Sequence, residues 1–256
     1  ITLTQEKYIT DAGAKFLNGA TSKTCSTPVH YSQLEAFTKI TTASNDVERA
    51  AMQSKAYLSL CGTLLWATIT HPEIAYYVSF ICQFMHDPSL AAWDAGITIL
   101  TYLQSVKSIG ITYDGENPTF VVFTDSSFGQ APVPFGGHVV MFAGGAVSFQ
   151  ARKLKLVPQS SMEAETACYS VGSKDLVYMS NVIGSDGMQL DMTKPITTYC
   201  DNDAAVSNVK NVGTSMRNRH FEKWLHFGRE LFLKLASKPI WIETKLNVAD
   251  IFTKPS

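Results

Sequence analysis

After residue 118, short apolar runs alternate with longer stretches of helical spacing, and this alternation restricts the chain to a few folds. Phe120-Val121-Val122-Phe123 is rich in β-branched and aromatic residues and predicts a strand covered on both faces. Residues 136–142 and 146–150, joined by Gly144-Gly145, predict a hairpin. Further strands are expected at 196–200 and 239–243, and helices at 160–182, 203–209, 218–236 and from 248. The order βββαβααβα predicts a mixed α/β layer fold with a five-stranded sheet.

The earlier part of the chain has a different pattern. Apolar spacing predicts helices within 45–70, 74–84 and 91–106, and Pro72 and Pro88 each precede a new helical run. The segment 22–46 is rich in Ser and Thr and is expected to be an exposed, mobile linker. The turn at 114–118 separates the two patterns. We therefore predict a mainly helical segment over 1–116 and an α/β domain over 117–256.

The charge balance is close to even, with 21 basic and 22 acidic side chains, so any contact with nucleic acid has to be local. Five cysteines are scattered singly, which favours reduced thiols over a disulfide framework or a zinc knuckle. No signal sequence or spanning segment is evident, so no membrane contact is expected. Ile1 at one end and Lys254-Pro255-Ser256 at the other suggest a piece of a longer polypeptide.

Three acidic residues occupy positions where α/β folds usually place their chemistry. Asp125 and Asp201 follow predicted strands, and Asp250 lies in the first turn of a predicted helix. A single Asp in a turn is more often a local cap. Three together favour a functional site over three separate caps.

Two glutamates compete for the place of a fourth acid. Ser160 and Glu163 form an S-x-x-E capping box, which gives Glu163 a structural role. Glu165 points about 200° away around the helix and faces the first strand, so it is the better candidate. Clustered carboxylates are costly to bury without a cation. Two Mg²⁺ ions about 3.5 to 4 Å apart could activate a water and stabilise a leaving oxygen, which indicates phosphoryl transfer to water.

Six motifs in a fixed order carry a resemblance to a known family. They are F-T-D-S-S (123–127), G-G-A-V-S-F (144–149), S-S-M-E-A-E (160–165), Y-C-D-N-D-A-A (199–205), R-N-R-H-F (217–221) and A-D-I-F-T-K-P (249–255). With these, residues 120–255 resemble the ribonuclease H domain of copia-type retrotransposon Pol polyproteins. Residues 3–8, 57–66, 71–76 and 84–88 resemble the thumb and connection segment that joins the reverse transcriptase to that domain.

The resemblance implies a ribonuclease H-like fold and hydrolysis of the RNA strand of RNA/DNA hybrids during reverse transcription. It implies that Asp125 bridges two Mg²⁺ ions, that Glu165 and Asp201 hold one, and that Asp250 helps hold the other, which carries the nucleophilic water. Mn²⁺ could substitute for Mg²⁺. The implied partners are the hybrid and the rest of the Pol polyprotein, including the reverse transcriptase palm, whose paired aspartates are missing here. The implied location is intracellular, in the cytoplasm or nucleus, within virus-like particles.

The order of the acids, D, E, D, D, disfavours the integrases and transposases of the same broad fold, which typically run D, D, E. Many ribonucleases H carry a histidine before the final helix, whereas residues 243–247 contain none and offer Lys245 as a substitute. The two-proline segment 129–135 also departs from the usual copia-type turn.

Basic residues near the start of one helix are candidates for phosphate contacts, and their alternative role is a solvated helix face. They are Arg217, Arg219, His220, Lys223 and Arg229, with Arg152, Lys153 and Lys155 after the third strand. Tyr57, Trp66, Tyr76 and Tyr77 lie in apolar helical stripes and are predicted to be core residues. Two other functions stay open: a catalytically inactive nucleic-acid-binding remnant of a retrotransposon polyprotein, and a nuclease for other nucleic acids.

Overall fold

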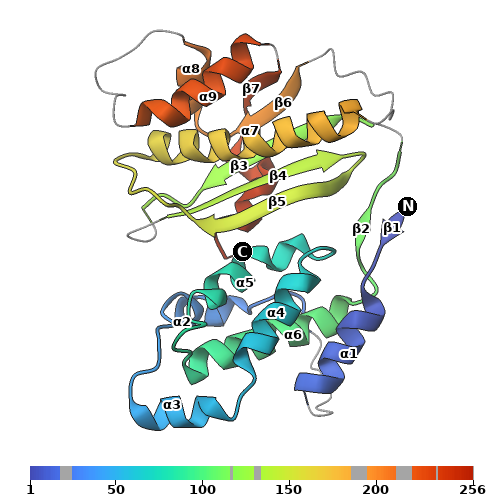
Figure 1. The fold of residues 1–256 in the computed structure, drawn as a ribbon, viewed down its shortest axis with the longest axis vertical. Helices are drawn as coiled ribbons and strands as arrows, with labels where there is room; N and C mark the ends of the chain where they lie inside the picture. The colour runs from blue at the N-terminus through green and yellow to red at the C-terminus, as the bar shows by residue number, and fades with distance from the viewer. Residues whose placement is uncertain are drawn as a thin grey trace. The chain divides into compact units, whose positions relative to one another are not determined.

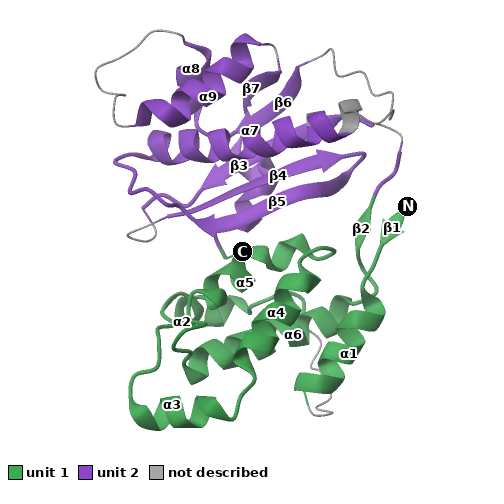
Figure 2. Cartoon of the chain, in the orientation of Figure 1, with its two compact units in different colours: residues 1–112, 255–256 green, residues 113–254 purple. Residues whose placement is uncertain are grey.

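The computed structural model describes residues 1–17, 25–115, 118–129, 134–185, 195–211, 221–234 and 236–255. The chain divides into two compact units, residues 1–112 with 255–256, and residues 113–254 (Figure 2). All five cysteines lie within the described residues, and none of them forms a disulfide bond. Within these ranges no helix combines the length and apolar character needed to span a bilayer.

The first unit is built of short helices and one small two-stranded sheet. Its α-helices are α1 (Glu6–Phe16), α2 (Leu34–Thr38), α3 (Asp46–Gln53), α4 (Tyr57–Ala67), α5 (Ala75–Cys82) and α6 (Leu90–Val106). The 3₁₀ turns η1 (Tyr31–Gln33) and η2 (Pro72–Ile74) precede α2 and α5, and β1 (Thr2–Leu3) pairs antiparallel with β2 (Ile111–Thr112). The predicted helical character of this segment is therefore observed.

Three details of this unit differ from the sequence predictions. The stretch 45–70 forms two helices, α3 and α4, instead of one. Part of the expected linker folds into η1 and α2 because Phe37, 4% exposed, packs its ring 4.9 Å from that of Phe80. Tyr57, Tyr76 and Tyr77 are buried as predicted, but Trp66 is 57% exposed. Its apolar spacing does not place it in the core, because α4 is apolar on its outer face as well.

The second unit contains a five-stranded mixed sheet in the order β5-β4-β3-β6-β7. Its strands are β3 (Phe120–Ser126), β4 (Phe135–Phe142), β5 (Gly145–Lys153), β6 (Ile196–Cys200) and β7 (Ser237–Trp241). β3, β4 and β5 run antiparallel, whereas β6 lies parallel to β3 and β7 parallel to β6. This arrangement confirms the predicted ribonuclease H-like mixed sheet.

Helices cover both faces of this sheet. On one face, α7 (Ser161–Ser185) crosses β3 and β4, and α8 (Asp203–Lys210) and α9 (Glu222–Leu233) pack beside it (Figure 1). Two short 3₁₀ helices follow β7, η4 (Thr244–Leu246) and η5 (Val248–Phe252), and η5 contacts β3, β4 and β5. The predicted last helix is thus a 3₁₀ helix. The core under α7 gathers Val122, Val140, Leu176 and Ile196.

Local signals explain where two of these elements begin and end. Ser160 Oγ accepts the backbone N–H of Glu163 at 3.3 Å, so the predicted cap of α7 is present. The Glu163 carboxylate accepts from the N–H of Gln159 at 2.8 Å, one residue before the expected partner. In the β4–β5 hairpin the turn residues are Ala143 and Gly144, with φ of 49° and 81°. Two successive positive φ values are typical of the type I′ turns that match strand twist, so the turn lies one residue before the predicted one.

Candidate metal centre

Parallel pairing of β3 and β6 brings the first two acids together. The register pairs Thr124 with Cys200 at the end of the shared ladder. Asp125 and Asp201, the residues that follow them, therefore leave neighbouring parallel strands at the same end of the sheet. This is the strand-end position at which α/β folds collect ligands.

The turn at η5 brings Asp250 to the same place. Asn247, which is buried, donates from Nδ2 to the carbonyl of Thr124 at 3.0 Å and accepts the N–H of Ala249 at 3.2 Å. It thereby caps η5 and ties it to β3. Thr253 Oγ1 donates to the Asp125 carboxylate from the end of the same turn. Carboxylate oxygens of Asp125, Asp201 and Asp250 lie within 4.8 Å of one another.

α7 supplies the fourth acid. Glu165 Oε1 accepts from the backbone N–H of Ser126 at 2.9 Å and from its hydroxyl at 2.8 Å. Glu165 also lies beside Asp201, because ligand atoms of Glu165, Cys200 and Asp201 are within 4.8 Å of one another. The four acids named from the sequence thus lie in one cluster. Glu163 is held at the helix cap, as its place in the capping motif indicated.

Two of the four acids are almost fully buried, and the other two are partly exposed. Asp125 is 1% exposed and Glu165 is 4% exposed. Burial, with smaller contributions from Asp201 and Asp250, raises the pKa of Asp125 to about 7, although Thr253 and Lys254 act in the opposite direction. Burial, followed by the charges of Asp125 and Asp201, raises the pKa of Glu165 well above its ordinary value. Ionising this cluster therefore requires a compensating cation.

The donor set fits a hard divalent ion. Among the described residues, Asp250 Oδ1 is a buried oxygen that accepts no hydrogen bond. Four converging carboxylates offer oxygen ligands of the kind that Mg²⁺ and Mn²⁺ prefer. The thiol of Cys200 lies 3.6 Å from Glu165 Oε2, but burial raises its pKa well above its ordinary value, so it stays a neutral neighbour.

The sequence analysis missed the residues that hold the carboxylates. Ser126, Asn247, Thr253 and Lys254 each contact the acids or their turn. Three of the four lie inside the quoted motifs F-T-D-S-S and A-D-I-F-T-K-P, so their proximity in sequence was available as a signal. The directions of their side chains could not be predicted from the sequence.

The basic residues divide into three groups. Arg217, Arg219 and His220 lie outside the described residues. Lys223 is exposed on α9, and Lys153, Lys155 and Lys245 are exposed as well. Arg229 is only 5% exposed and donates from Nε to the carbonyl of Asn208 at 2.9 Å, so its expected phosphate contact is wrong. Its position on the inner face of α9, against α8, is the reason.

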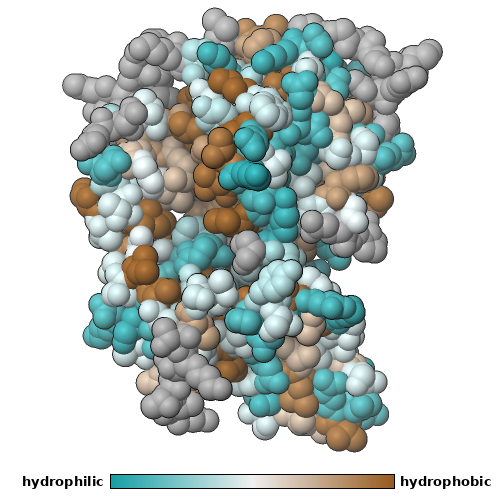
Figure 3. All heavy atoms as spheres, turned by 180° about the vertical axis from the view of Figure 1, so that it is seen from behind, coloured by the Kyte–Doolittle hydropathy of each residue, from teal (hydrophilic) through white to brown (hydrophobic). Residues whose placement is uncertain are grey.

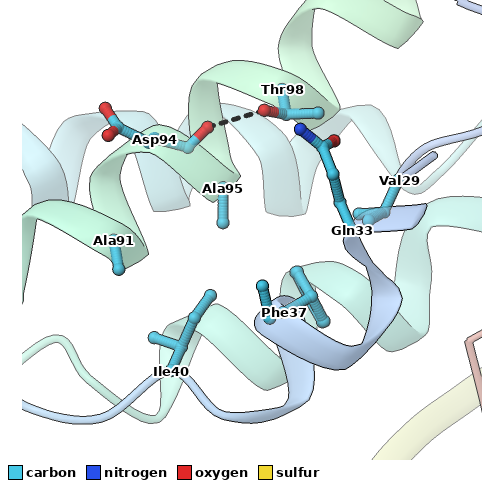
Figure 4. A pocket seen from close by; sticks show the side chains of 9 residues that line it. Val29, Gln33, Phe37, Ile40, Ala91, Asp94, Ala95 and Thr98 are labelled. Carbon is cyan, nitrogen blue, oxygen red and sulfur yellow. Dashed lines mark hydrogen bonds between the residues drawn. The ribbon is translucent and has the colours of Figure 1, made fainter. Parts of the chain in front are cut away.

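Elsewhere, the surface and the cavity in the helical unit show no comparable cluster of acidic groups among the described residues. On the face drawn in Figure 3, hydrophilic residues are interspersed with hydrophobic ones among the coloured atoms. A cavity of about 230 Å³ lies in the helical unit, between α2 and α6 (Figure 4). Phe37, Ile40, Ala91 and Ala95 line it, and the Thr98 hydroxyl at its edge donates to the Asp94 carbonyl at 2.8 Å. Asp94 is the one carboxylate among its lining residues, and a single carboxylate does not make a metal site or an acid–base pair.

No protein-family model matches the chain. In an alignment that covers 98% of its length, it is 28% identical to the retrovirus-related Pol polyprotein from transposon TNT 1-94 of Nicotiana tabacum. In an alignment that covers 99% of its length, it is 28% identical to that from transposon RE1 of Arabidopsis thaliana. It spans 19% and 17% of these two relatives. The predicted resemblance to transposon Pol polyproteins is thereby confirmed.

Solved structures that are similar to part of this chain were also found. One is the N-terminal RNase H domain of Rv2228c from Mycobacterium tuberculosis, at 15% identity and a TM-score of 0.40, covering 53% of this chain and 90% of that one. Another is RNase H1 from the archaeon Halobacterium salinarum, at 14% identity and a TM-score of 0.39, covering 53% of this chain and 94% of that one.

Proposed function

We propose that the second unit is a metal-dependent ribonuclease that hydrolyses the RNA strand of RNA/DNA hybrids during reverse transcription of a retrotransposon. The observation that carries this proposal is the cluster of Asp125, Glu165, Asp201 and Asp250 at one end of the sheet. Two of these acids are almost fully buried. Burying like charges side by side lowers the stability of the fold, so their convergence indicates a functional role. Similarity to transposon Pol polyproteins along nearly the whole chain supports the same function.

In this proposal Asp125 is the shared ligand of two Mg²⁺ ions, Glu165 and Asp201 complete one site, and Asp250 helps to form the other. The ions would supply charge compensation, an activated water and stabilisation of the leaving oxygen. The protein holds the carboxylates in place. Ser126 engages Oε1 of Glu165, and Oε2 accepts only a long contact from the Cys200 thiol among the described residues, so that oxygen is available as a ligand. Mn²⁺ is expected to replace Mg²⁺.

The proposed substrate, an RNA/DNA hybrid, rests on the similarity to transposon Pol polyproteins and on exposed basic residues. Lys223 on α9 is one candidate for contact with hybrid phosphates, and Arg217, Arg219 and His220 precede it in sequence. Such contacts would fix the register without reading bases, so recognition would rely on shape and 2′-hydroxyl groups. We propose that residues 1–116 are the thumb and connection segment of a reverse transcriptase, and that the palm and the rest of Pol are partners. By the same similarity we place the activity inside cells, in virus-like particles.

A cleavage assay on the whole chain tests the nuclease proposal. The substrate is an RNA/DNA hybrid labelled on the RNA strand, with Mg²⁺, Mn²⁺ or EDTA. Glu165→Gln is expected to lower the rate by about 100-fold or more, since an essential electrostatic group is neutralised without a change of shape. Glu163→Gln is the matched control, because Glu163 lies two residues away in the cap of the same helix. It should stay within about threefold of wild type.

Four results would contradict the proposal. Equal rates for the two variants would remove Glu165 from the site, and cleavage in EDTA would remove the metal. Binding of the hybrid without cleavage in either metal would instead support a catalytically inactive remnant. Duplex RNA and duplex DNA belong in the same assay, because preferential cleavage of either would identify a nuclease of different specificity.

A further inference from the structure

A positive side chain reaches into the carboxylate cluster. Lys254 Nζ lies 2.6 Å from Asp250 Oδ1, and the Lys254 side chain is 28% exposed. The two groups form a short ion pair. A carboxylate that the metal proposal assigns as a ligand is thus already in contact with a cation.

The fold explains why Lys254 lies there. Thr253 Oγ1 donates to Asp125, and the Lys254 N–H donates to the Asp250 carbonyl at 3.3 Å. These two hydrogen bonds hold both Thr253 and Lys254 beside the cluster. Asp250 shares its cluster with Asp125 and Asp201, so the ammonium lies beside a group of carboxylates. A lysine side chain is protonated at neutral pH, and it therefore brings a full positive charge to this cluster.

We propose that Lys254 is a built-in counter-ion, which neutralises the Asp250 side of the cluster in the metal-free protein and competes with a divalent ion for Asp250. This inference rests on the proposed metal site. It assigns to Lys254 a role in setting metal affinity, and no role in the bond-breaking step.

Competition follows from size and charge. A divalent ion bound to Asp250 at about 2.0 to 2.1 Å would lie within a few ångström of the ammonium, and two cations at that separation repel. Lys254 is attached by a flexible four-carbon chain and is partly exposed, so its head can move into solvent without unfolding η5. Metal binding therefore has to break the Lys254–Asp250 ion pair, which weakens the observed affinity.

Calorimetric titration of the whole chain with Mg²⁺ and with Mn²⁺ tests this role without measuring catalysis. Lys254→Met keeps an apolar stem and removes the charge, and we expect it to bind metal about tenfold or more tightly than wild type. Lys254→Arg keeps the charge and should stay close to wild type. Lys238→Met is the matched control, because Lys238 is an exposed lysine of β7 and its loss changes the net charge equally.

Fluorescence and thermal unfolding give independent readouts. Trp241 Nε1 donates to the carbonyl of Asp201 at 3.1 Å, so its emission should report metal binding beside it. In EDTA, Lys254→Met should unfold at a lower temperature than wild type, since the carboxylates lose their counter-ion. In saturating Mg²⁺ this order should reverse.

Two outcomes overturn the inference in different ways. If Lys254→Met binds metal as weakly as wild type or more weakly, then Lys254 does not compete, and the metal site itself survives. If neither wild type nor Lys254→Met binds either ion, the proposed metal function fails together with the inference.

Discussion

Replacing Asp125 with asparagine should make the metal-free protein more stable at alkaline pH and remove most of its stabilisation by Mg²⁺. Asp125 is 1% exposed, so its ionised form has lost nearly all contact with water. Asparagine has almost the same shape and keeps an oxygen that can accept the Thr253 hydroxyl, which now bonds to Asp125. The substitution therefore removes a charge and leaves the packing largely as it is.

The pKa of Asp125 gives the size of the effect. Burial raises it from 3.8 to about 7, so between these values the folded protein holds a proton that the unfolded chain has lost. Stability conferred by this residue is therefore lost as the pH rises through that window, and the full cost is present above about pH 7. At about 1.4 kcal/mol for each pH unit, the ceiling is about 4 kcal/mol. Asp201 and Asp250 share the electrostatic cost, so we expect a gain of about 1 to 4 kcal/mol.

Urea unfolding in EDTA measures this gain. Near pH 8 the Asp125→Asn variant should unfold at a higher urea concentration than wild type. Near pH 5 the difference should be less than half as large, because the pH window over which the stability is lost begins at 3.8. Asp203→Asn, which alters an exposed acid of α8, should follow wild type at both pH values. Added Mg²⁺ should stabilise wild type far more than Asp125→Asn. A variant that is less stable than wild type in EDTA near pH 8 would refute the view that this buried charge is uncompensated.

Two further substitutions test how the turn carrying Asp250 is held. A methyl group on Gly137 would lie 2.5 Å from Cβ of Phe252, so Gly137→Ala should push η5 away from the sheet. We expect calorimetry to show that Mg²⁺ binds this variant about tenfold or more weakly. Unchanged affinity would show that η5 can move without disturbing Asp250. Asn247→Ala removes the buried hydrogen bond to the Thr124 carbonyl and should lower the free energy of unfolding, measured by urea denaturation, by about 1 to 3 kcal/mol. A change below about 0.5 kcal/mol would contradict the anchoring role of Asn247.

Local sequence patterns predicted most of the α/β unit. The apolar run at 120–123 marks β3, and the Ser160 cap marks the start of α7. Such signals act over a few residues, so they are readable before the chain folds. Boundaries were less accurate: β7 begins at Ser237, two residues before the predicted strand, because the ladder with β6 extends the strand beyond its apolar core.

Exposure was harder to predict, since it depends on what packs against each face. Trp66 and Arg229 have the spacing of core and surface residues respectively, yet Trp66 is 57% exposed and Arg229 only 5%. The first lies on a helix that is apolar all round, and the second faces a neighbouring helix. Periodicity within one helix does not contain that information.

The sequence by itself determined which residue types are present, the order of strands and helices in the α/β unit, and the strand-end or helix-start positions of the acids. Only the tertiary structure decided that Thr253 contacts Asp125, because the turn that carries Thr253 is held against β3 by contacts more than a hundred residues distant in sequence. The same contacts bring the local Lys254–Asp250 pair to the cluster. The charge balance of the candidate metal centre is therefore a property of the folded chain.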